Sequence, residues 1–191
     1  GRPPPSAPWL SCDEYDRARG DGAKPEEAPS AELRPALGVF RHEAVAVDPE
    51  AKQLYLTEDE HDGRLYRFTP DRYPDLSSGT MEVLQLSPSQ PGRPAPVRWL
   101  ALPDPSARDR PTRRQVSEST PFNGGEGIWH HAGQVVFATK GDNRVWAYDT
   151  RASTLRLLYD HATSSRPNLS GVDNVLVSPA GDVLVAEDAG D

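Results

Sequence analysis

Three stretches of this sequence repeat one arrangement: an acid, an apolar strand, a tight turn, a second apolar strand and another acid. The opening acids are Glu43, Glu126 and Asp173. The closing acids follow 16, 16 and 15 positions later, at Asp59, Asp142 and Asp188. Third strands are predicted at 63–68 and 143–149, and fourth strands at 81–86 and 155–159. Their alternation of apolar and polar residues is typical of half-buried antiparallel strands.

This repeat predicts an all-β fold, a β-propeller in which each unit is one four-stranded blade. The second and third units begin 47 residues apart, which is one blade length, whereas the first and second begin 83 apart. The surplus lies at 87–121, a Pro-, Arg- and Ser-rich insertion that we expect to be a functional or disordered loop. Residues 38–191 then form about three blades, and 1–37 form a loop-rich N-terminal segment. An ordinary β-sandwich is the alternative.

The ends of the sequence favour an internal piece of a longer protein. It opens with Gly-Arg-Pro-Pro-Pro, without Met or the apolar region of a signal peptide. Two to three blades cannot close a ring, and an open arc exposes strand edges. We therefore expect this piece to be unstable alone. The sequence contains no run of eighteen apolar residues, so we expect no membrane span.

The charge balance narrows the choice of partners. The chain has 29 acidic and 21 basic residues, and its formal net charge is −8. Such a chain repels nucleic acids and anionic membranes. The same surplus of carboxylates suits hard cations, which prefer oxygen ligands.

The opening acids predict a metal site. In a propeller the innermost strands start beside the central channel, so Glu43, Glu126 and Asp173 should converge there. Packed carboxylates repel one another unless a cation lies between them. Asn174 would add a neutral oxygen of the kind that calcium accepts. The alternative is that each acid only caps a turn.

Other candidates surround this site. Glu187 is a further ligand candidate, and His42, Glu58 and Asp188 are expected to lie behind the ligands. The Asp142-Asn143 pair is typical of a turn. Cys12, beside Asp13, would be a soft ligand among hard ones, a mixture that suits iron better than calcium alone. A half-buried structural cysteine is the alternative. No catalytic motif is visible, so the catalytic residues are unassigned.

Taken in order, several stretches of the chain resemble the PhoX family of bacterial alkaline phosphatases. They are Trp-Leu-Ser-Cys-Asp-Glu at 9–14, Gly-Val-Phe-Arg-His-Glu-Ala-Val-Ala-Val-Asp-Pro at 38–49, Leu-Tyr-Leu-Thr-Glu-Asp at 54–59, and shorter matches at 65–68, 125–128, 145–149, 172–174 and 185–188. No single stretch is specific to the family, but together they are.

The resemblance implies a six-bladed propeller, exported to the periplasm or beyond, that hydrolyses small-molecule phosphate monoesters at a site of iron(III) and calcium ions. The family's iron-binding cysteine would be Cys12, and its carboxylates would include Glu43 and Glu126. Asp13, a further metal-ligand candidate, stands where the family usually has a Glu that contacts calcium, and its side chain is one carbon shorter. The family's phosphate-binding arginines have no counterpart beside Glu126, where Gly124 and Gly125 stand.

Two other functions remain open from the sequence. Glu126-Gly127-Ile128-Trp129 resembles the metal-ligating Glu-Gly-x-x-Trp of calcium-dependent lactonases of the gluconolactonase type. A non-enzymatic binding propeller, with metal as a structural element, is the other alternative.

Overall fold

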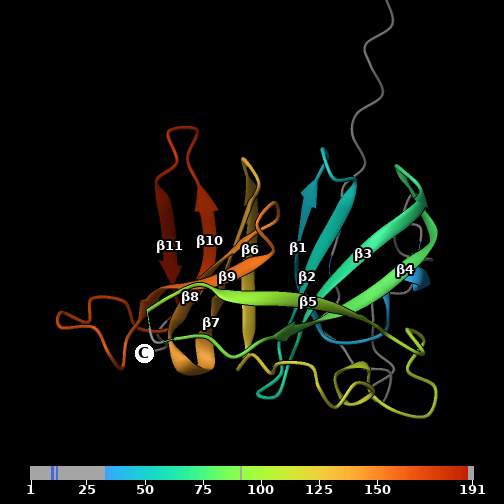
Figure 1. The fold of residues 1–191 in the computed structure, drawn as a ribbon, viewed down its shortest axis with the longest axis horizontal. Helices are drawn as coiled ribbons and strands as arrows, with labels where there is room; N and C mark the ends of the chain where they lie inside the picture. Colours follow the sequence, from blue (N-terminus) through green and yellow to red (C-terminus); the bar gives the residue numbers. More distant parts are fainter. Residues whose placement is uncertain (1–9, 11, 13–32, 91, 189–191) are drawn as a thin grey trace, which may run out of the picture.

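The computed structural model describes residues 10, 12, 33–90 and 92–188, and in that part the chain forms antiparallel strands (Figure 1). The first blade consists of β1 (His42–Asp48), β2 (Gln53–Glu58), β3 (Leu65–Arg72) and β4 (Asp75–Leu86). The second consists of β6 (Gly125–His131), β7 (Gln134–Thr139), β8 (Arg144–Asp149) and β9 (Thr154–Asp160). The third contributes β10 (Val172–Val177) and β11 (Val183–Glu187).

The first strands of the three units lie side by side. β6 packs against β1 on one side and β10 on the other (Figure 1). Blades that fan out from a row of inner strands are the arrangement of a propeller, and the predicted all-β, partial-propeller fold is confirmed. Among the described residues the helical segments are short: η2 (Pro35–Leu37), η3 (Thr112–Arg114) and η4 (Lys140–Asp142). None of them has the length or the apolar character that crossing a membrane requires.

The second strand of each complete blade holds neighbouring layers together. In β2, Tyr55 enters the core between the first two blades, while Leu54 and Leu56 enter the core on the other face of the sheet. In β7, Val135 and Phe137 pack toward the first blade, whereas Val136 and Ala138 pack toward the third. Successive side chains of a strand point to opposite faces, so a strand buried on both faces must be apolar throughout. Each fully buried Leu, Val or Phe side chain among them contributes about 2 kcal/mol.

The insertion at 87–121 is not a loop throughout. It contains β5 (Ala95–Ala101), which pairs with β4 along Glu82–Leu86 and reaches β9 through Ala95 and Pro96. The outer edges of two blades are thereby joined into one nine-stranded sheet, in the order β1-β2-β3-β4-β5-β9-β8-β7-β6. The expectation of a functional or disordered loop missed this strand, because its Pro-rich flanks hide the alternation of Val97 and Trp99.

Trp99 explains why this segment is ordered. Its indole Nε1 donates a hydrogen bond to the hydroxyl of Tyr148, at 3.0 Å, and its ring packs edge-on against that tyrosine. The ring of Tyr55 lies 5.9 Å away, and the guanidinium of Arg67 stacks over the indole. One side chain of β5 thus contacts both complete blades.

The second and third blades approach each other closely at Gly127. A Cβ built on Gly127 would lie 2.5 Å from Oδ1 of Asn174, 2.7 Å from its Cα and 2.8 Å from the amide nitrogen of Val175. Two of these three atoms belong to the backbone of β10 and cannot move without moving the strand. Only glycine therefore permits this approach of β6 and β10.

We expect Gly127→Ala to destabilise the protein by about 2 kcal/mol, because the added methyl group must push β10 away from β6. Urea unfolding followed by circular dichroism would measure this. Gly92→Ala is the control: a Cβ there meets nothing within 4 Å, so only the left-handed φ of 74° resists it. Equal stability of Gly127→Ala and the wild type would contradict the packing described.

Candidate metal centre

Each inner strand carries the same irregularity at its acidic residue. Between the pairs His42–Glu58 and Val45–Leu56, β1 has one residue more than β2. β6 and β10 show the same extra residue, between Gly125 and Ile128 and between Val172 and Val175. Such a β-bulge redirects the side chains of the unpaired residues. Glu43, Glu126 and Asp173 are each the first residue of the bulge, so they occupy equivalent positions in the three blades.

The three bulge acids meet. A carboxylate oxygen from each of Glu43, Glu126 and Asp173 lies within 4.8 Å of the others. Glu126 is buried, and the other two are half-buried. We call these three residues the acid triad. The structure thus brings together the three acids that the sequence repeat selected.

The acid triad is electrostatically crowded. Burial and, next in size, the charges of Glu43, Asp173 and Asp59 together raise the pKa of Glu126 to about 8, while Lys140 acts in the opposite direction. A cation between the three carboxylates would relieve this repulsion. The donor set consists of oxygens from three blades, which is the chemistry that a hard cation such as calcium requires.

A second set of equivalent positions follows the second strand of each blade. The amide of Asp59 donates to the carbonyl of Arg41 (3.1 Å), that of Lys140 to Gly124 (2.8 Å), and that of Asp188 to Gly171 (2.7 Å). In every blade the acceptor stands two positions before the triad acid. Lys140, not Asp142, is therefore the counterpart of Asp59 and Asp188.

The equal spacing of 16 residues was misleading in the second blade. Asp142 lies in η4, accepts a hydrogen bond from the hydroxyl of Thr139 (2.6 Å) and pairs with Arg144 (2.9 Å). Asn143 caps η4 with a left-handed φ of 50°, as its prediction as a turn residue requires.

Lys140 is the functional candidate that sequence reasoning missed. Its ammonium group lies 3.2 Å from Oδ2 of Asp173 and 2.9 Å from Oδ2 of Asp188. These carboxylates raise the pKa of Lys140 above its usual value. Aligning the repeats on the end of the second strand, instead of on the nearest acid, would have found it.

Glu58 belongs to a different network from the acid triad. It is fully buried, and its Oε2 accepts hydrogen bonds from the Tyr66 hydroxyl (2.8 Å) and the Arg64 amide (3.2 Å). Its Oε1 lies 3.3 Å from the guanidinium of Arg113 in η3. The insertion thus supplies the countercharge for a carboxylate of the first blade.

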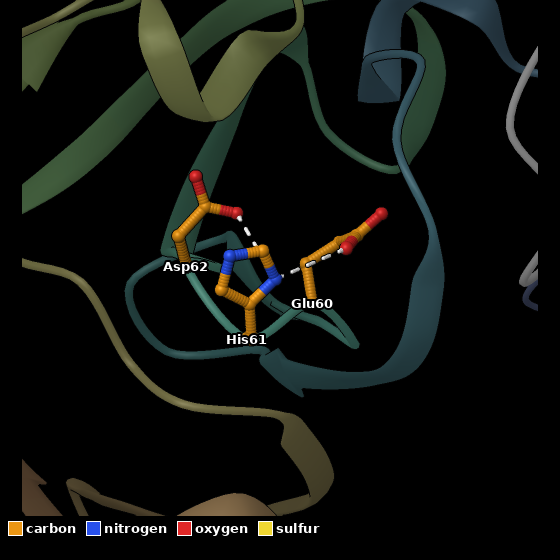
Figure 2. A group of neighbouring side chains, drawn as sticks. All are labelled: Glu60, His61 and Asp62. Atoms are coloured by element: carbon orange, nitrogen blue, oxygen red, sulfur yellow. Dashed lines mark ion pairs between the residues drawn. The ribbon is translucent and has the colours of Figure 1, made fainter.

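The turn after Glu58 holds another group of possible ligands. Figure 2 shows His61 between Glu60 and Asp62, with 3.9 Å between its ring nitrogen and a carboxylate oxygen of each. Arginines already neutralise these acids: Arg113 lies 3.5 Å from Glu60 and 2.8 Å from Asp62, and Arg114 lies 3.5 Å from Asp62. This group is therefore a weaker cation site than the acid triad.

The remaining predicted residues lie at varied places. The His42 ring stacks on Phe40, and its Nε2 lies 3.1 Å from the Gly38 carbonyl. Asn174, the second residue of its bulge, contacts Gly127. Glu187 accepts a hydrogen bond from the amide of Ser170. These residues stay predictions as members of the metal site.

Of the predicted iron ligands, Glu43 and Glu126 belong to the acid triad, and Cys12 is not grouped with them. Cys12 is half-buried, and its sulfur belongs to neither group of possible metal ligands found among the described residues. Asp13 lies outside the described residues. The iron site stays a prediction.

Burial gives Glu58 a measurable effect on stability. It raises the pKa of Glu58 from 4.5 to about 7, against the opposing effects of Tyr66 and Arg113. The folded protein then binds this proton more tightly than the unfolded chain. The stabilisation is complete below the unfolded pKa and is lost as the pH rises through the folded pKa.

We therefore expect the wild type to lose on the order of 3 kcal/mol through this group between about pH 4.5 and 8, and Glu58→Gln to lack that slope. Urea unfolding at a series of pH values measures both. Glu118→Gln, at an exposed position, should keep the wild-type slope. A Glu58→Gln protein with an unchanged slope would rule out this account.

Comparison with known families agrees with the geometry. None of the curated proteins compared with the chain matches it. The family model described as alkaline phosphatase PhoX matches residues 21–155, more than half of the chain. Glu43, Glu126 and Lys140 lie inside the matched region, whereas Cys12, Asp173 and Asp188 lie outside it. The three-blade architecture, the bulge acids and this match lead to one conclusion: the chain belongs to the PhoX alkaline phosphatase family.

Proposed function

We propose that the protein hydrolyses phosphate monoesters of small molecules at a cation site built on Glu43, Glu126 and Asp173. The observation that carries this proposal is the convergence of three equivalent carboxylates, one from each blade, within 4.8 Å. The family match supports the reaction class. Calcium and iron(III) are the proposed ions, and the periplasm or the cell exterior is the proposed location.

The acid triad would hold the cation, and Cys12 would hold iron. A bound cation supplies Lewis-acid chemistry, in which it neutralises charge on the phosphoryl oxygens. Glu126 is fixed for this purpose, because the hydroxyl of Thr57 donates a 2.6 Å hydrogen bond to its carbonyl. The same hydroxyl lies 3.2 Å from the amide of Ala44, in the bulge of β1. One side chain of the first blade therefore sets the relative positions of two triad strands.

The charges at the site also determine how a phosphate ester would bind. The acid triad and the acids around it repel a phosphate dianion, so a substrate can approach only when cations balance them. Lys140 is a protein cation already in place beside Asp173. Burial of Glu126 limits access of water to the inner side of the site.

Hydrolysis of p-nitrophenyl phosphate tests the proposal. In the presence of calcium and iron we expect Glu126→Gln to lower kcat/KM by a factor of about 100 or more, because the cation loses its buried carboxylate. Glu118→Gln is the control and should retain wild-type activity, since that side chain is exposed. Hydrolysis that survives both chelation and Glu126→Gln would refute the cation site, and cleavage of a lactone in place of the phosphate ester would favour the lactonase alternative.

The role of Cys12 has a separate test. We expect Cys12→Ala to abolish iron in the purified protein while calcium content is retained, because the thiolate is the one soft ligand proposed. Elemental analysis of the wild type and variant measures both metals. Unchanged iron in Cys12→Ala would remove this residue from the site.

A further inference from the structure

Lys140 breaks the repeat at a position where charge matters. The backbone hydrogen bonds of Asp59, Lys140 and Asp188 make these residues counterparts in three blades. Two of the three blades place a carboxylate at this position, and the second blade places an ammonium. The substitution changes the local charge by two units relative to the symmetric arrangement.

The position lies where it can act on the acid triad. A charge at this position lies close to the triad, since the ammonium group of Lys140 is 3.2 Å from a carboxylate oxygen of Asp173. Lys140 is directed toward the next blade, where it contacts the triad member Asp173 as well as Asp188. Its side chain is 34% exposed, so the solvent reduces its effect without removing it.

We propose that Lys140 is the residue that sets the affinity of the acid triad for cations and its selectivity between divalent and trivalent ions. The inference rests on the proposed cation site. Lys140 partly neutralises the carboxylate charge of Asp173, and its own positive charge repels any cation that the triad binds. Coulomb repulsion is proportional to the charge of the ion, so a trivalent ion is disfavoured more than a divalent one.

A purely structural role predicts something else. If Lys140 only fastened η4 to β10 and β11, its removal would loosen Asp173 and weaken the binding of every cation. The two roles therefore predict opposite signs, and only the electrostatic role predicts a dependence on ionic charge.

The test measures binding of Ca²⁺ by calorimetry and of Tb³⁺ by luminescence, each added alone to the metal-free protein. We expect Lys140→Met to bind Ca²⁺ about tenfold and Tb³⁺ about thirtyfold more tightly than the wild type. Lys140→Arg, which keeps the charge, should stay close to the wild type. Lys52→Met is the matched control, because Lys52 is exposed in the β1–β2 turn, at the far end of β1 from Glu43.

A second variant keeps the inference testable if Lys140→Met does not fold. Lys140→Gln removes the charge and keeps a polar side chain at this position, so both ions should bind more tightly than to the wild type, with the larger gain for Tb³⁺. Binding that is unchanged or weaker in Lys140→Met, or equal gains for both ions, would overturn the inference. Failure of the wild type and all variants to bind either ion would instead overturn the proposed cation site itself.

Discussion

The candidate site depends on one extra residue in each inner strand. In a regular strand successive side chains alternate between the two faces of the sheet. Of the inner strands, β6 packs against β1 on one side and against β10 on the other. The bulges at Glu43, Glu126 and Asp173 release one side chain per blade from this alternation. Because the same irregularity recurs in three blades packed side by side, the released carboxylates meet at one place. The crowding of charge at Glu126 follows from that geometry.

Much of this could be predicted from the sequence, and the exceptions have physical reasons. The apolar strands and the acid before each of them are local patterns, so the blades and the acid triad could be predicted from the sequence. Lys140 could not be predicted in this way, because turn lengths differ between blades and counting 16 residues from Glu126 leads to Asp142. The contacts of Glu58 could not be predicted either, because its partner Arg113 lies 55 residues away in an insertion with no repeat to align. The strand β5 was not predicted because it lies in the same insertion.

The two kinds of cation in this region act differently. Arg113, Arg114 and Arg41 together pair with Glu58, Glu60 and Asp62. The turn that carries these acids also supports the second blade, since the amide of Gly124 donates to the carbonyl of Glu60 at 2.9 Å. These acids are thereby balanced within the protein and serve the structure. Lys140 balances Asp173 and Asp188 only in part. The residual negative charge is therefore concentrated at the acid triad, where a cation can use it.

The strand β5 has a consequence for how the molecule opens. It gives the outer edges of the first two blades a shared hydrogen-bond ladder, so neither blade can separate from the other without breaking β5 from β4 or β9. Local unfolding tends to follow such contiguous units. The nine-stranded sheet should therefore exchange its amide hydrogens as a single cooperative unit. The β10–β11 hairpin shares no ladder with that sheet in the described structure and should exchange on its own, carrying Asp173 away from Glu43 and Glu126 whenever it opens.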